Sequence, residues 1–138
     1  MNRILSALFA VGVLASACGG DEEEPAIDAG PDAMPPTGTI SLSWVISEGG
    51  APSDCQTAGV QLVSMALVRQ GEGAGETDVF TCTAGEATTR QLRVGTYNLS
   101  LDLVSSTGDR LLPEPLEMNG IVVSDGGNQD LGQITFEL

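Results

Sequence analysis

The side chains that could do chemistry in this sequence are carboxylates, hydroxyls, arginines and three thiols. Its 138 residues include no histidine, and all five cations are arginines because lysine is absent as well. Histidine and lysine are the usual general bases, Schiff-base nucleophiles and imidazole metal ligands. A Ser-His-Asp triad, a Ser-Lys dyad and a Lys-Asn isopeptide bond are therefore excluded. We expect a protein that is not an enzyme and that holds no cofactor.

Asp125, Asn128 and Asp130 are the candidates for a metal site, because calcium prefers hard oxygen donors. They lie close together around Gly126 and Gly127. Their spacing lacks the alternating Asp-x-Asp-x-Asp-Gly order and the downstream bidentate Glu of a calcium loop. The same residue types are typical of a turn between strands. We interpret the segment as a turn, with calcium binding as the alternative.

Pairs of carboxylates raise the alternative of a hydrolase. Glu72 with Glu76, or Asp102 with Asp109, would be the acid pair of a glycosidase-like site. Nothing in the sequence places either pair across a cleft, and one Trp and one Tyr offer little from which to build a sugar subsite. We interpret these acids as solvated surface charge.

The charge balance excludes one class of partner. Acidic side chains outnumber basic ones by 19 to 5, and the formal charge is −14. Binding to nucleic acid requires a basic surface that neutralises phosphates. We therefore expect no nucleic-acid partner, and the length predicts one domain.

Residues 1–17 have the pattern of a secretory signal peptide. Arg3 is followed by a nearly continuous apolar run from Ile4 to Ala15 and then by small residues. As a helix this run would extend about 18 Å, which is well short of the roughly 30 Å hydrocarbon core of a bilayer. We therefore expect export rather than a transmembrane anchor.

The end of this segment resembles the lipobox of bacterial lipoproteins. The matching residues are Leu14-Ala15-Ser16-Ala17-Cys18, although the family favours a larger aliphatic residue where Ala15 stands. The resemblance implies cleavage before Cys18, acylation of its thiol and new amino group, and a membrane anchor. Gly19 follows instead of Asp, which for this family implies the outer membrane. An ordinary signal peptide cut near Ala17 is the alternative.

Residues 18–37 have the composition of a disordered linker. Apolar residues are few, so the segment cannot bury enough surface to offset the entropy of ordering. The linker has four prolines, and its six like charges favour an extended chain: Asp21, Glu22, Glu23, Glu24, Asp28 and Asp32.

Residues 38–138 predict an all-β domain. Segments 39–47 and 96–104 alternate apolar and polar side chains with a period of two, the pattern of a half-buried strand. Trp44 lies on the apolar face of the first segment, so we expect it in the core. Further strands are expected at 60–69, 78–83, 87–92, 110–112, 117–124 and 129–138.

Breaks in the apolar–polar alternation predict bulges, and turn residues predict where the strands end. A phase change near Leu62 and the glycine at position 132 each predict a β-bulge. Residues 71–76 predict a glycine-rich loop, and Pro113 with Pro115 indicates an edge or a crossing because neither nitrogen can donate a hydrogen bond. The prediction is a single small antiparallel β-sandwich of seven or eight strands.

Two elements give this domain a family resemblance. Gly95-Thr96-Tyr97 opens a long alternating strand after the turn at 92–94, and residues 130–136 form a closing strand. In this order they resemble the transthyretin-like (prealbumin-like) sandwiches described as carboxypeptidase regulatory-like domains. The resemblance covers residues 38–138 and implies an accessory, non-catalytic fold with no functional residues to transfer. An immunoglobulin-like sandwich is the alternative.

Cys55 and Cys82 predict a disulfide. If Cys18 is acylated, these two remain, and an even number of cysteines in an exported domain is typical of disulfide bonding. Neither a histidine nor a CxxC spacing supports a metal site. Two free core cysteines and a pair of functional thiols are the alternatives.

Together these patterns predict a membrane-anchored bacterial lipoprotein that presents a non-catalytic β-sandwich at the cell envelope, as a binding or structural module. The expected contacts are the membrane, through the lipid on Cys18, and an unidentified envelope protein or glycan. We expect a monomer. The alternative functions are a carboxylate-based hydrolase and a calcium-binding accessory protein.

Overall fold

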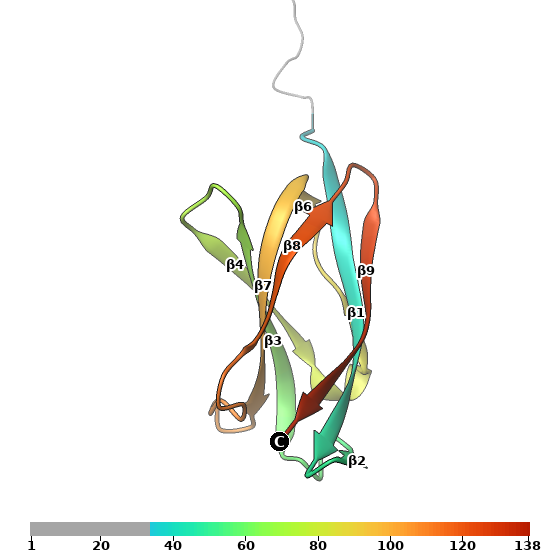
Figure 1. Ribbon diagram of the computed structural model, residues 1–138, viewed down its shortest axis with the longest axis vertical. Coiled ribbons are helices and arrows are strands. Elements are labelled where there is room, and N and C mark those ends of the chain that lie inside the picture. The colour runs from blue at the N-terminus through green and yellow to red at the C-terminus, as the bar shows by residue number, and fades with distance from the viewer. Residues whose placement is uncertain (1–33) are drawn as a thin grey trace, which may run out of the picture. The chain divides into compact units, whose positions relative to one another are not determined.

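Two twisted sheets face each other in the computed structural model, which describes residues 34–138 (Figure 1). The compact unit begins at Pro35. The predicted signal peptide (1–17), Cys18 and the linker up to residue 33 lie outside the described residues. Within the described range, no helix is long and apolar enough to cross a bilayer. The predicted all-β sandwich is confirmed.

The described chain forms nine strands and one short 3-10 helix, η1. In chain order they are β1 (Thr37–Glu48), β2 (Ala51–Ser53), β3 (Val60–Arg69), β4 (Gly75–Thr81), η1 (Cys82–Ala84), β5 (Glu86–Thr88), β6 (Leu92–Arg93), β7 (Gly95–Ser105), β8 (Leu116–Val123) and β9 (Asn128–Glu137).

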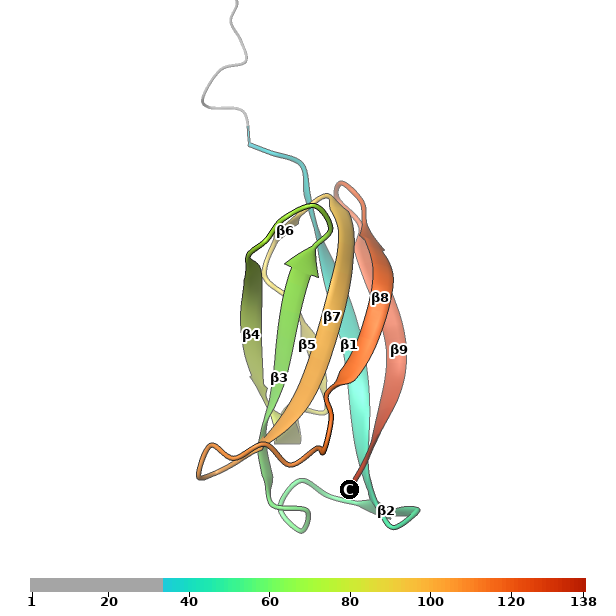
Figure 2. The ribbon, with the colours of Figure 1, turned by 60° about the vertical axis from the view of Figure 1, so that its left-hand side comes forward.

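One sheet has the order β4-β3-β7-β8 and is antiparallel throughout, as Figure 2 shows from its outer side. The other sheet is organised around β1. β6, β5 and β2 pair with successive segments of β1, and β9 pairs with it from Thr39 to Ser47. β1 is therefore the central strand of this sheet.

The core lies between the sheets and is built from the inward residues of the alternating strands. β1 and β7 bury every second side chain along most of their length. Trp44 is only 5% exposed, which confirms its predicted place in the core. The largest fully buried side chains are Phe136, Ile40, Met65, Leu67, Leu99, Leu101, Leu103, Val63 and Cys82.

Both predicted bulges are present. The register between β3 and β7 shifts between Val60 and Leu62. On β9, Leu131 and Gly132 lie opposite the single residue Leu42, and Gly132 has a φ of 74°. This left-handed conformation favours glycine, which explains why that residue interrupts the apolar alternation.

One pairing departs from the expected antiparallel arrangement, because β1 and β9 pair in parallel. The chain leaves β8 in one sheet and crosses to the other before β9 begins. Such a crossing places the last strand beside the first in the same direction. Alternation reports which face of a strand is buried and carries no information on strand direction.

The expected strand count of seven or eight was also too low. Ala51–Ser53 pairs with the end of β1, and the expected strand at 87–92 is divided into β5 and β6. The division follows from Thr89, which is buried and bonds Ile40 twice. Its hydroxyl accepts from the Ile40 amide at 3.0 Å, and its own amide donates to the Ile40 carbonyl at 2.9 Å.

The expected strand at 110–112 is absent. Arg110 makes an isolated bridge to Val104, and the chain then turns until β8 begins at Leu116. Pro113 and Pro115 lack the amide hydrogens that would extend the bridge into a ladder. The strand predicted at 78–83 begins earlier, at Gly75, and ends at Thr81 because Cys82 enters η1.

Gly38 provides a test of this packing. A Cβ there would overlap the Ser124 carbonyl oxygen and lie 2.8 Å from the Gly127 carbonyl oxygen. Because both obstacles are backbone atoms, Gly38→Ala should lower the free energy of unfolding by about 1–3 kcal/mol. Urea denaturation measures the change. Gly73→Ala is the control, since a Cβ there would meet nothing within 4 Å, and equal stability of the two variants would contradict the packing.

Candidate functional site

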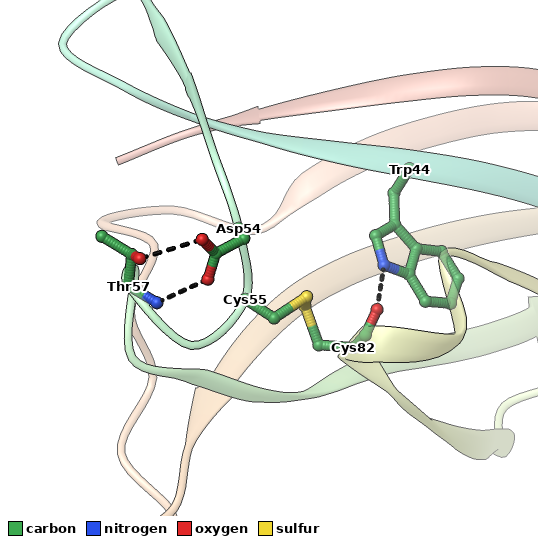
Figure 3. The surroundings of a disulfide bond; sticks show 5 residues. All are labelled: Trp44, Asp54, Cys55, Thr57 and Cys82. Atoms are coloured by element: carbon green, nitrogen blue, oxygen red, sulfur yellow. Dashed lines mark hydrogen bonds between the residues drawn. A yellow bond between two sulfur atoms is a disulfide. The ribbon is translucent and has the colours of Figure 1, made fainter.

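A disulfide joins two of the connections that link the sheets at one end of the sandwich (Figure 3). Cys55 lies in the connection from β2 to β3, and Cys82 lies in η1 between β4 and β5. Both connections pass from one sheet to the other. The Cα atoms are 5.9 Å apart, and the predicted pairing of the two cysteines is confirmed. We call this region, residues 49–59 and 82–85, the disulfide end.

Asp54 holds the first connection in shape. Its carboxylate accepts hydrogen bonds from the Thr57 amide at 2.8 Å and from the Thr57 hydroxyl at 2.9 Å. The Ala58 amide donates to the Asp54 carbonyl, which closes the same turn at 2.9 Å. These bonds favour the charged carboxylate, so Thr57, first through its amide and then through its hydroxyl, lowers the pKa of Asp54 below its ordinary value of 3.8.

Trp44 fixes the second connection from inside the core. Its indole Nε1–H donates to the Cys82 carbonyl at 2.9 Å, as Figure 3 shows. The Trp44 amide also donates to the Gly85 carbonyl at 2.9 Å. The ring is buried, and its one polar atom is satisfied by η1. Trp44 is therefore a structural residue and not an exposed platform for a ligand.

A cavity of about 450 Å³ lies beside the disulfide. β5 pairs with β1 only as far as Ser43, and β2 begins to pair at Ile46. The gap between these two strands is where the cavity opens. Its lining includes Trp44, Val45, Pro52, Asp54, Gln56 and Thr83.

The cavity lining combines apolar side chains with a few polar ones. Its volume lies within the usual range of small-molecule sites. Asp54 is the one charged side chain in the lining, and its carboxylate already accepts two bonds from Thr57. No acid-base pair or nucleophile-base pair is present among the lining residues. The cavity can receive an apolar group with a polar edge.

The calcium candidates lie in β9 and in the turn before it. The Asn128 side chain accepts from the Thr39 hydroxyl and donates to the Ser41 hydroxyl, each at 2.9 Å. The Asp130 carboxylate accepts from the Gly132 amide at the bulge. Asp125 lies in the turn before β9. Across residues 34–138, no three His, Cys, Asp or Glu side chains lie close enough to hold a metal ion.

The carboxylates of the hydrolase alternative are bound to other partners. Glu72 pairs with Arg69 at 2.7 Å, and Glu76 pairs with Arg90 at 3.5 Å. Asp102 forms an ion pair with Arg110. Asp109 accepts a bond from the hydroxyl of Thr107, at 2.6 Å. Each acid stabilises a local turn or pairing.

Sequence reasoning missed the role of Arg90. This residue lies between β5 and β6 and reaches β4 in the opposite sheet. Its guanidinium lies 2.6 Å from the Asp78 carboxylate and donates to the Thr77 carbonyl at 3.1 Å. It thereby joins the two sheets along one open side of the sandwich. A single exposed arginine leaves no sequence pattern by which this role could be predicted.

The Gly-x-Tyr element organises the end opposite the disulfide. The Tyr97 hydroxyl donates to the Arg93 carbonyl at 2.9 Å, and the Arg69 guanidinium donates twice to the Val94 carbonyl, at 3.1 and 2.8 Å. A Cβ on Gly95 would lie 2.5 Å from Arg69 Nε. Glycine is therefore required here to admit the arginine.

Comparisons with known proteins do not show a family. No protein-family profile matches the chain, and no curated protein matches it. Among solved structures, it is similar to a leucine-rich repeat protein from Bacteroides thetaiotaomicron, with 16% sequence identity and a TM-score of 0.45. The match covers 74% of this chain and 12% of the other. The chain thus spans about an eighth of that protein's length.

The disulfide should contribute strongly to stability. It joins residues separated by 27 positions. In the chain-entropy treatment, a loop of that size stabilises the folded state by about 3.6 kcal/mol. The double variant Cys55→Ala/Cys82→Ala should lose about this amount in urea denaturation. Wild-type protein reduced with dithiothreitol is the control and should lose a similar amount, whereas unchanged stability in both would contradict the assignment.

Asp54 should titrate with a pKa below 3.8 in the folded protein. A lowered folded pKa means that the stabilisation is present at neutral pH and is lost as the pH falls through that value. Thr57→Val removes the hydroxyl donor and should raise the pKa, as NMR titration of the Asp54 carboxyl carbon would measure. Thr83→Val is the control, because its hydroxyl makes no bond to Asp54. A titration unaffected by Thr57→Val would refute the stated cause.

Proposed function

We propose that this protein is a lipid-anchored bacterial lipoprotein whose sandwich acts as a non-catalytic binding or structural module at the cell envelope. Cys18 carries the lipid and residues 18–37 form the spacer. The lipobox-like segment before Cys18 supports the anchor, and Gly19 supports the outer membrane as its location. More than one acyl chain would make the anchoring stable.

The direction of β1 is the observation that carries the proposal. β1 begins at Thr37, beside β6 and the turn before β9, and ends beside β2 (Figure 1). The chain therefore enters the sandwich at the end opposite the disulfide. A tether attached there leaves the disulfide end, with its cavity, unobstructed by the attachment point. An attachment point remote from the cavity suits a module that presents a binding surface.

The chemistry of the disulfide end favours binding over catalysis. The cavity has apolar walls and polar edges, and its connections are held by the disulfide, Asp54 and Trp44. Rigid loops lose little conformational entropy on association, which favours recognition. An envelope protein or an envelope glycan is the partner class that we propose.

Within the sandwich class we propose a transthyretin-like assignment, on the resemblance of the Gly95-Thr96-Tyr97 element and of the closing strand at 130–136. The first strand lies inside its sheet, between β5 and the parallel last strand, and faces the order β4-β3-β7-β8. The buried Tyr97 of the Gly-x-Tyr element adds to the resemblance. The accessory role of that family agrees with the proposed function.

Mass spectrometry of protein extracted from membranes tests the anchor. The mature chain should begin at Cys18 and carry acyl groups, and it should fractionate with the outer membrane. Cys18→Ala should remove the acyl mass and leave the sandwich, with its Cys55–Cys82 bond, intact. A water-soluble wild-type product that begins at another residue would overturn the proposal.

A further inference from the structure

The second half of β9 has a free backbone edge. β9 pairs with β1 alone among the described strands. The Leu138 amide donates to the Ser47 carbonyl, and the Gly49 amide donates to the Leu138 carbonyl. Because backbone groups alternate in direction along a strand, the amides and carbonyls of residues 133, 135 and 137 point away from β1. Three donors and three acceptors are thus available at this edge.

The outer edges of β4 and β8, the edge strands of the other sheet, are obstructed. The Arg90 guanidinium covers the edge of β4 by bonding the Thr77 carbonyl and the Asp78 carboxylate. β8 contains Gly120 at a φ of 76°, and its register with β7 shifts at this point. Bulges and charged side chains of this kind are common protections against pairing with another chain.

The segment from Gln133 to Phe136 contains neither a bulge nor a charged side chain. The bulge of β9 is confined to Leu131 and Gly132, and the following residues pair with β1 in unbroken register. The sequence Gln-Ile-Thr-Phe-Glu contains three strong strand formers and no proline or lysine. The side chains of Gln133, Thr135 and Glu137 are exposed, while Ile134 and Phe136 are buried.

The negative charge of the protein indicates which kind of strand could pair with β9. The sequence has a formal charge of −14, so a second copy of this acidic chain would be repelled. The edge ends at the exposed carboxylate of Glu137. Arg69 pairs with Glu72 and Arg90 pairs with Asp78, both near β3 and β4 of the other sheet. These two cations therefore do not neutralise the edge of β9. A basic strand is therefore favoured over an acidic one.

We propose that β9 binds an extended, basic segment of a partner protein, which adds as a strand along Gln133–Glu137. Backbone hydrogen bonds supply the affinity, as in other cases of strand addition. On the outer face, basic side chains lie beside Glu137. On the inner face, apolar side chains extend the core next to Ile134 and Phe136. This inference rests on the proposed role of the sandwich as a binding module.

Hydrogen exchange in the free protein tests the edge itself. The amides of Gln133, Thr135 and Glu137 should exchange rapidly, and those of Ile134 and Phe136 should exchange slowly because they donate to β1. NMR of the full-length protein in detergent resolves each amide. Slow exchange at all five positions would mean that the edge is already covered, and it would overturn the proposal.

A synthetic heptapeptide of alternating lysine and valine tests strand addition. Its binding should slow exchange at Gln133, Thr135 and Glu137 by tenfold or more. A peptide with glutamate in place of lysine should give no protection. The lysine peptide methylated on every backbone nitrogen keeps its charge but has no amide donors, so it should also fail. Equal binding of the methylated peptide would show attraction by charge alone and would overturn the proposal.

Thr135→Pro tests the same edge from the protein side. It removes an amide that points away from β1, and proline is tolerated at such edge positions. Binding of the lysine peptide should fall at least tenfold, whereas the matched control Thr135→Val keeps the amide and should bind as the wild type does. If the proline variant fails to fold, the methylated peptide still decides the question on the wild-type protein.

The test of the lipid anchor and the test of strand addition can fail independently of each other. Loss of peptide protection in a protein that is acylated at Cys18 overturns the strand-addition proposal and leaves the anchor in place. Protection in a protein that is not acylated overturns the anchor and leaves the strand-addition site in place.

Discussion

The pairing of β1 along both of its edges is the constraint on which the rest of this structure depends. One edge bonds β9 over nearly its whole length, and the other is shared among β6, β5 and β2. Because three short strands share one edge, a gap remains near Trp44, where the cavity opens. Because β9 takes the other edge and no described strand pairs beyond it, the sheet ends in a free strand. Both candidate binding features follow from one strand.

Side chains, rather than further strands, close the sandwich. The disulfide joins the crossings at one end, and Tyr97 and Arg69 hold the backbone before β7 at the other. Arg90 connects the sheets along the open side beside β4. The disulfide contributes most among these links, because exposed ion pairs contribute only about 0–1 kcal/mol each. The disulfide also holds the cavity walls in place, since both of its cysteines lie in the lining.

Much of the fold could be predicted because its signals are local. Alternation of apolar residues located β1, β3, β7 and β9, and the change of phase at Leu62 and the glycine at 132 located the bulges. The 110–112 segment and the division of β5 from β6 could not be predicted in this way. There, the prolines after Leu112 and the bond from Thr89 to Ile40 outweighed local preference.

By itself, the sequence determined the all-β class, the Cys55–Cys82 pair and the absence of histidine and lysine chemistry. The fold class depends on a period of two that acts over a few residues, and the other two properties depend on which residue types are present. Only the tertiary structure decided that β9 runs parallel to β1, that Arg90 reaches β4 and that residues 133–137 form a free edge. These three features depend on which distant segments of the chain come together. The alternation of apolar and polar side chains along a strand is the same whichever strand it pairs with, so it cannot predict them.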